Sequence, residues 1–145
     1  MEIREATMQD IKPIYEMLLN MHSETKIKLA PVKPEKLYNT IKLALEEGIV
    51  LVAEVEGKII GSLGGMKNCD WWSDEKHLSD IWYYVAPEKR NSLAAIKLVK
   101  NFIYSGNSAK LKIKLGHVFS GDIERKDKFF ERLGLTKAGS LFVEI

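Results

Sequence analysis

The sequence predicts a single domain, residues 1–145, of the α/β (α+β) class, in which a mixed, mostly antiparallel sheet carries helices on both faces. Two strand-like runs, 49–55 and 58–66, flank Glu56-Gly57, which is typical of a hairpin turn. A further apolar run, 78–86, leads through a helical stretch to another strand, so those two strands should be parallel. The expected order of elements is β-α-α-β-β-β-α-β-α-β.

The N-terminal third predicts one short strand and two helices. Residues 3–6 form the expected strand, and Thr7 is positioned to cap the helix that follows, in which apolar residues recur on one face. Pro34 is suited to the first turn of the second helix, and Gly48 is suited to its end.

The remaining two thirds predict the rest of the sheet. Three glycines in the strand at 58–66 indicate a bulge or a close approach of backbone. In the strand at 78–86, alternation should place Ile81, Tyr83 and Val85 on one face and Asp80, Trp82 and Tyr84 on the other. We then expect a helix at 92–105, a strand at 110–115, a helix at 123–133, and one more strand or a short hairpin within 135–145.

Composition and charge exclude several classes of protein. The chain has 22 basic and 20 acidic residues, a net charge of +2, which gives no reason to expect a nucleic acid or a membrane as partner. The single cysteine, Cys69, excludes an internal disulfide, and it forms no metal-ligand spacing with the three histidines. No signal peptide and no apolar run long enough to span a bilayer is evident, so we expect a soluble, cytoplasmic protein.

The turn after Pro87 is the segment that most clearly indicates a ligand. Pro87 ends an apolar strand, a short polar turn containing Arg90 follows, and helical spacing begins near Ala95. Unpaired N–H groups and the dipole at the start of a helix attract phosphate. The sequence therefore predicts an anion-binding turn beside Arg90.

Four segments resemble the GCN5-related N-acetyltransferase family, in the family's order and spacing. They are the opening strand and helix, the central hairpin, the strand that ends in Tyr-Val-Ala-Pro-Glu-Lys-Arg, and a final helix running into a Leu-Gly-Leu turn: residues 3–11, 51–61, 84–90 and 129–135. The resemblance covers nearly the whole chain and implies the family's fold. Trp71-Trp72 and the Arg-Asn-Ser-x-Ala-Ala turn also resemble acetyltransferase-like proteins of bacterial viruses.

This resemblance implies that acetyl-CoA binds between the strands at 78–86 and 110–115 as a cosubstrate, without a metal. Backbone groups of Tyr84 and Val85 would bond the pantetheine arm and the acyl carbonyl. The family carries a glycine where this chain has Leu93, so Leu93 should keep a negative φ and turn its side chain away from the phosphates. The residues expected to meet the diphosphate are Arg90, Asn91, Ser92, Leu93, Ala94 and Ala95.

The resemblance also implies a set of candidate catalytic residues. Asp80, where relatives often carry a carboxylate, is one candidate base, with an ordinary strand-start residue as the alternative. His117, just after the strand at 110–115, is another, with a surface histidine as the alternative, and His77 is a weaker third. The family's usual thiolate acid is a tyrosine, and this chain has Phe130 there. Tyr84 is the candidate replacement; the other possible donors are Tyr83, Tyr104, Ser120 and water.

Candidate acceptor-binding residues lie in the loop at 67–77 and in the first helix. Trp71 and Trp72 could form a wall of the acceptor site, with neighbouring acidic residues attracting an amine. The alternative is that the two rings cover the end of the core. Glu24 lies in the region where the family varies its specificity.

The resulting hypothesis is an acetyl-CoA-dependent N-acetyltransferase. It would move an acetyl group by direct attack to a primary amine on an unidentified small molecule or peptide, and it could form a homodimer. The alternative is a non-catalytic acyl-CoA-binding or structural protein that retains the fold, which Leu93 and Phe130 favour.

Overall fold

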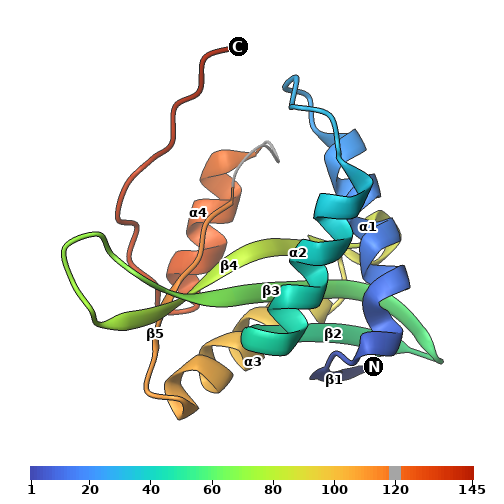
Figure 1. Cartoon of the computed structure of the whole chain (residues 1–145), viewed down its shortest axis with the longest axis horizontal. Helices are drawn as coiled ribbons and strands as arrows, with labels where there is room; N and C mark the ends of the chain where they lie inside the picture. Colours follow the sequence, from blue (N-terminus) through green and yellow to red (C-terminus); the bar gives the residue numbers. More distant parts are fainter. Residues whose placement is uncertain (118–121) are drawn as a thin grey trace.

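The computed structural model describes residues 1–117 and 122–145 and contains a five-stranded sheet in the order β1-β2-β3-β4-β5 (Figure 1). The first three strand pairs are antiparallel, and β4 pairs with β5 in parallel, as the sequence predicts. The strands are β1 (Glu2–Glu5), β2 (Ile49–Val55), β3 (Lys58–Cys69), β4 (Lys76–Val85) and β5 (Lys112–Lys114).

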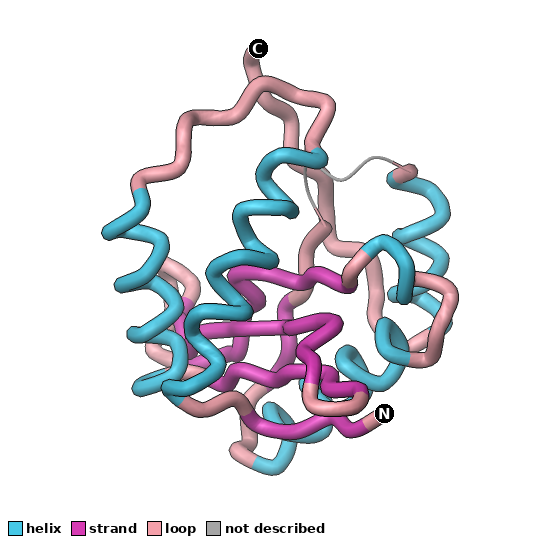
Figure 2. Tube along the Cα trace, turned by 90° about the vertical axis from the view of Figure 1, so that its right-hand side faces the viewer, coloured by secondary structure: helices cyan, strands magenta, loops and turns pink. Residues whose placement is uncertain are grey.

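Helices lie on both sides of this sheet, which confirms the predicted layers (Figure 2). Helices α1 and α2 pack against each other and on β2, β3 and β4, while α3 packs on the opposite face, where α4 contributes Phe130 to the same core. The helices are α1 (Ile11–Glu24), α2 (Pro34–Glu47), α3 (Ala94–Ser108) and α4 (Ile123–Arg132), with short 3-10 turns η1 (Met8–Asp10) and η2 (Pro87–Lys89). No helix in the described ranges is long and apolar enough to cross a membrane.

The N-terminal entry into α1 is held by a capping box. The Thr7 backbone N–H donates to Asp10 Oδ2 at 2.7 Å, and Arg4 donates two hydrogen bonds to the same carboxylate. The guanidinium of Arg4 is the main reason why the pKa of Asp10 is lowered. The cap therefore ties β1 to the start of the first helical layer.

Two apolar cores lie on the two faces of the sheet. On the α3 side, Phe102 and Leu98 are fully buried against Leu63. On the α1–α2 side, Ile14 and Ile41 are fully buried, and they cover the strand residues Val52, Trp82 and Tyr84. Both helical layers are therefore fixed to the strand that carries the candidate site.

A bulge in β4 changes which of its residues share a face. Gly64 of β3 pairs with Trp82, but Gly65 pairs with Asp80, so Ile81 is the extra residue. Ile81 therefore lies beside Trp82 on the α1–α2 side, whereas Asp80, opposite Gly65, lies on the α3 side. The expectations that Ile81 shares a face with Tyr83 and Val85, and that Asp80 shares one with Trp82 and Tyr84, are both wrong. Strict alternation of faces fails here because the inserted residue reverses which face of the sheet the residues before it occupy.

The glycines of β3 allow this close packing, as the sequence predicts. A Cβ on Gly64 would lie 2.3 Å from the Trp82 ring, and a Cβ on Gly65 would lie 2.6 Å from Phe102 and from a backbone oxygen of β4. The indole N–H of Trp82 then donates to the buried hydroxyl of Ser62 at 2.9 Å. The close approach and this hydrogen bond hold Trp82 in one position.

The predicted strand or hairpin within 135–145 is wrong, because no residue of that range is in a strand. After Gly134, which has a φ of +94°, the chain runs as an irregular segment with Leu141 and Phe142 exposed. Strand β5 is only three residues long and starts after Lys110, which has a φ of +60°. Such a short edge strand offers few backbone groups for another strand to pair with.

Candidate active site

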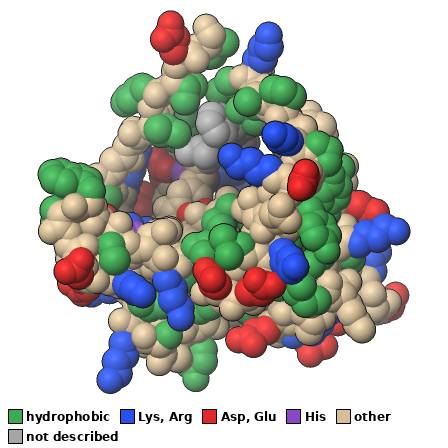
Figure 3. Space-filling view, in the orientation of Figure 1, with side chains coloured by type: hydrophobic (Ala, Val, Ile, Leu, Met, Phe, Trp, Pro, Cys, Tyr) green, Lys and Arg blue, Asp and Glu red, His purple; other side chains and the backbone are tan. Residues whose placement is uncertain are grey.

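Strands β4 and β5 separate at the centre of the molecule, and this separation forms the candidate site. Their parallel pairing covers three residue pairs and ends at Ser79 and Lys114, while β4 continues to Val85. In the space-filling view the molecule is hollowed between the C-terminal segment and the connection from α1 to α2 (Figure 3). The strand end at Val85 leads directly into η2 and then α3.

Asp80 is placed at the point of separation. Its Oδ1 accepts a hydrogen bond of 3.0 Å from the backbone N–H of Gly116, two residues beyond the last paired residue of β5. Burial raises the pKa of Asp80 to about 6, although this hydrogen bond and the nearby His117 act in the opposite direction. At neutral pH Asp80 is therefore an ionised carboxylate with an unusually high proton affinity.

His117 is held by a carboxylate from α4. Its Nε2 lies 2.6 Å from Asp127 Oδ1, and the other oxygen of Asp127 accepts from Lys137 Nζ at 2.8 Å. Lys137 and then His117 lower the pKa of Asp127, so Asp127 is an acceptor and His117 Nε2 carries the hydrogen. In the neutral imidazole, Nδ1 is then the nitrogen that carries no hydrogen.

The structure thus brings the two predicted bases, Asp80 and His117, to one end of the gap. Sequence reasoning missed Asp127 and Lys137, which orient His117. Asp127 belongs to an exposed helical pattern and Lys137 to an irregular segment. Neither position carries a pattern that indicates a partner.

The side chain at the family's acid position cannot donate a proton. Phe130 is 8% exposed, and its ring lies beneath His117, with centroids 5.6 Å apart. The hydroxyl of Tyr83 donates to the Ala95 backbone oxygen at 2.9 Å, and burial raises its pKa. Tyr104 is 73% exposed on α3. Ser120 lies outside the described residues.

The turn after β4 leads into the start of α3, where the sequence predicts an anion site. Leu93 is the N-cap of α3 with a φ of −74°, and its side chain is 59% exposed, so the negative φ is confirmed and the side chain does not fill the turn. The Ser92 hydroxyl accepts from the Ala94 N–H at 3.2 Å. The first N–H groups of a helix lack intrahelical partners. Apart from that of Ala94, the N–H groups in the first turn of α3 therefore point toward an approaching anion.

Arg90 is held at this turn by partners from three directions. Its Nε donates to the Val85 backbone oxygen at 2.9 Å, its Nη2 forms an ion pair with Glu24 at 2.9 Å, and its guanidinium lies 5.2 Å from the ring centre of Tyr84. Burial, and then the charge of Glu24 and its hydrogen bond, raise the pKa of Tyr84. Tyr84, Glu24 and Arg90 therefore form one group at the end of β4.

Lys126 of α4 is a second cation near this turn, which sequence reasoning missed. Burial lowers its pKa, and the positive charge of Arg90 lowers it further. Two cations from different elements that disfavour each other's charge create a positive potential between them. The arrangement suits a multiply charged anion.

Trp71 and Trp72, which the sequence predicts as acceptor-binding residues, lie elsewhere than at the gap between β4 and β5. Trp71 and Trp72 are 91% and 67% exposed at the tip of the β3–β4 hairpin, where their rings form an edge-to-face pair. The interpretation that they cover the end of the core is wrong. Asp70 pairs with Lys114, so the tip is fixed to β5.

The surroundings of the other two histidines, His77 and His22, indicate structural roles. His77 is 9% exposed within β4, where it pairs with Lys112 of β5. His22 Nε2 lies 2.8 Å from the Ala30 backbone oxygen. Within residues 1–117 and 122–145, no group of three or more His, Cys, Asp or Glu side chains could hold a metal ion.

Comparison with solved structures assigns this architecture to a known class. The chain is similar to an aminoglycoside 6'-N-acetyltransferase from Acinetobacter haemolyticus, with 14% identity and a TM-score of 0.74 over 100% of this chain and 97% of that one. It is also similar to a "predicted acetyltransferase with acetyl-CoA" from Clostridium acetobutylicum, with 14% identity and a TM-score of 0.77 over 99% and 94%. No protein-family model and no curated protein matches the sequence.

A third similar structure is a GNAT family acetyltransferase from Staphylococcus aureus, with 16% identity and a TM-score of 0.68 over 99% of this chain and 97% of that one. The fold of this chain is that of the GCN5-related N-acetyltransferases. The similarity extends over the whole chain, and it confirms the fold that the four sequence segments imply.

Proposed function

We propose that the protein transfers the acetyl group of acetyl-CoA to a primary amine. The observation that carries this proposal is the separation of β4 from β5 between an anion-binding turn and the carboxylate of Asp80. One structure of the same fold was solved with acetyl-CoA, and another belongs to an enzyme that acetylates an amine of an aminoglycoside. Both support the proposal at the level of the fold.

In this account the diphosphate of acetyl-CoA meets the first turn of α3. Arg90 and Lys126 supply positive charge from two sides, and the exposed side chain of Leu93 leaves the backbone accessible. Arg90 must then exchange its ion pair with Glu24 for the diphosphate. The residues present therefore fit the cosubstrate, despite the missing glycine.

The chemistry that follows is a direct transfer. The attacking group is the neutral amine, and a carboxylate with a pKa near 6 can accept the proton that its nitrogen releases as the bond to carbon forms. Asp80 is therefore the proposed base, with His117 beside it. The amine nitrogen forms a bond to the thioester carbon, the carbon–sulfur bond breaks, and the sulfur leaves as a thiolate. Phe130 cannot donate a proton, and the hydroxyl of Tyr84 is hydrogen-bonded to Glu24. We therefore assign the protonation of the thiolate to water.

A second function remains a candidate because of Phe130. If the protein only binds acyl-CoA, it needs no acid at this position, and a phenyl ring packed beneath His117 is then a purely structural choice. Both functions require acyl-CoA binding, and only the first requires Asp80.

The deciding experiment measures release of the coenzyme A thiol in the presence of a panel of amines and peptides. We expect turnover with at least one amine and a loss of 100-fold or more in Asp80→Asn. Asp70→Asn is the matched control, because it removes a carboxylate from the hairpin tip. Binding of acetyl-CoA without turnover across the panel would favour the non-catalytic alternative.

A further inference from the structure

An apolar cavity of about 180 Å³ lies between α1, α2 and the bulge of β4. Its walls come from all three elements and from the loop between the two helices. Leu18 and Trp82 form its buried side, and Ile81 is 44% exposed at its edge. The apolar lining residues are Leu18, Met21, Val32, Leu37, Ile81 and Trp82.

The polar groups that line the cavity already have partners in the protein. His22 Nε2 donates to the Ala30 oxygen, and the Thr40 hydroxyl donates to the Lys36 oxygen, each at 2.8 Å. The indole N–H of Trp82 donates to Ser62. A polar ligand group inside the cavity would therefore lose its hydration without a donor to replace it, whereas an apolar group loses nothing.

The cavity and the proposed base lie on opposite faces of β4, at neighbouring positions of the strand. Ile81 is the bulged residue and directly follows Asp80 in β4, so the strand carries the base and the cavity wall at consecutive positions. A bulge re-aims side chains beside it. Here it turns Ile81 to the α1–α2 side, while Asp80 stays on the α3 side. The pairing of β4 with β5 ends at Ser79, so the gap beyond it connects the two faces beside Asp80 and Ile81.

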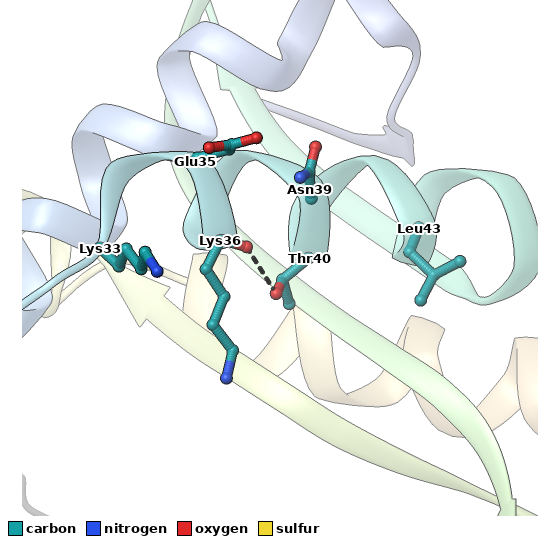
Figure 4. Close-up of a pocket in the computed structure, with 6 residues that line it drawn as sticks. All are labelled: Lys33, Glu35, Lys36, Asn39, Thr40 and Leu43. Carbon is teal, nitrogen blue, oxygen red and sulfur yellow. Dashed lines mark hydrogen bonds between the residues drawn. The ribbon is translucent and has the colours of Figure 1, made fainter.

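A larger hollow, of about 460 Å³, lies along the outer side of α2 (Figure 4). All its lining residues come from that helix and its N-cap, and they include Lys33, Glu35 and Lys36. None of them comes from the strands that carry the site. The small apolar cavity is therefore the better candidate for recognition of an acceptor.

We propose that the acceptor is a primary amine that carries an aromatic or branched aliphatic group, and that this group occupies the apolar cavity while the amine reaches Asp80 through the gap between β4 and β5. The inference rests on the proposed function. A cavity of about 150 Å³ lined by Leu, Ile and Phe holds benzene, so about 180 Å³ suits one phenyl or one branched butyl group. Sugars and other polyhydroxylated amines are excluded from it by the lack of free donors.

Two measurements test this proposal. The first compares kcat/KM for 2-phenylethylamine and for ethylamine at saturating acetyl-CoA, and we expect a ratio of at least ten. Val32→Phe should fill the cavity and lower the ratio tenfold with less than a twofold change for ethylamine. Leu43→Phe, which adds a ring to the exposed side of α2, should leave both values unchanged.

The second measurement does not depend on turnover. In ¹³C-methyl-methionine NMR spectra, addition of 2-phenylethylamine should shift the methyl signal of Met21, which lines the cavity, and leave that of the exposed Met8 in place. Val32→Phe should abolish the shift. A folded variant is verified by its melting temperature.

The outcomes separate the two proposals. Equal kcat/KM for the two amines, an equal loss for both in Val32→Phe, or an unmoved Met21 signal would overturn the inference while leaving acetyl transfer intact. If no amine is acetylated, the proposed function fails, and the Met21 signal alone decides: a saturable shift supports the cavity as an apolar amine site, and no shift overturns it.

Discussion

The carboxylate of Asp80 accepts a hydrogen bond from the backbone N–H of Gly116 at 3.0 Å, just beyond the last paired residues of β4 and β5. The side chain of Asp80 thus replaces the backbone hydrogen bond that β4 and β5 would form if their pairing continued. The same placement half-buries the carboxylate and raises its pKa to about 6. One contact thus connects the opening of the sheet with the proposed base.

The raised pKa of Asp80 predicts a specific pH profile. The base acts only when ionised, so it becomes active as the pH rises through about 6, and the amine itself must also lose a proton. Below about pH 6 the logarithm of kcat/KM should therefore rise with a slope of two, and above it with a slope of one. Asp80→Asn should show a slope of one throughout, measured as thiol release between pH 5 and 8.

The stability of the same variant provides an independent check. A carboxyl whose folded pKa is raised stabilises the fold most when protonated, and this contribution is lost as the pH rises from about 4 to about 6. Asp80→Asn should therefore raise the melting temperature at pH 8 relative to the unchanged protein, and should raise it less at pH 4. An equal effect at both pH values would contradict burial as the cause of the shift.

The hydrogen bond between Asp127 and His117 predicts that Asp127 is a positioning residue. Asp127→Asn should lower kcat about tenfold with little change in KM, because the amide can donate to Nε2 as well as accept from it and so no longer fixes one tautomer of the imidazole. Imidazole ¹⁵N shifts should show loss of a single tautomer. Lys137→Met is the matched control, since it removes the other partner of Asp127 and should leave the His117 tautomer in place. An unchanged tautomer in Asp127→Asn would contradict this role.

The ion pair between Arg90 and Glu24 predicts opposite effects of two substitutions on acetyl-CoA binding. Arg90→Gln should weaken binding about tenfold, because it removes a cation from the turn. Glu24→Gln should strengthen binding two- to fivefold, because Arg90 no longer has a competing carboxylate. Lys97→Gln, an exposed cation on α3, is the control for net charge and should have little effect in titration calorimetry. Weaker binding in Glu24→Gln would show that the pair supports the site rather than competing for it.

The contact between Gly64 and Trp82 predicts a stability effect. Gly64→Ala should destabilise the fold by about 2 kcal/mol, because the new Cβ would lie 2.3 Å from a buried ring that cannot move without losing its bond to Ser62. Gly139→Ala, where a Cβ meets nothing within 4 Å, should change stability by less than about 0.5 kcal/mol. Urea denaturation measures both. Equal midpoints for the two variants would contradict the close approach.

The order of elements could be predicted because it depends on local signals. Hairpin residues Glu56-Gly57, the helix-starting Pro34 and the turn after Pro87 all mark boundaries that the structure confirms. The missing last strand could not be foreseen from residues 135–145 alone. Its formation depends on the edge offered by β5, which is a property of another segment.

The candidate site could be predicted only in part. Asp80 was a candidate because relatives often carry a carboxylate near the start of this strand, and His117 because it follows a strand. The turn after Pro87 was a candidate anion site because of its sequence pattern. The bulge at Ile81 reverses the faces of β4, and the cavity beside it depends on three elements. Asp127, Lys137 and Lys126 reach the site from α4 and the C-terminal segment through tertiary packing, which leaves no local pattern.

The most direct test of the central claim is the melting temperature of the protein with and without acetyl-CoA. A ligand present at 100 times its dissociation constant stabilises the folded state by about 2.7 kcal/mol. For a domain of this size that corresponds to roughly 5 to 10 °C, and Arg90→Gln should reduce the shift at equal concentration. A rise of this size with millimolar acetyl-CoA is the predicted result, and no rise at that concentration would contradict both acetyl transfer and acyl-CoA binding.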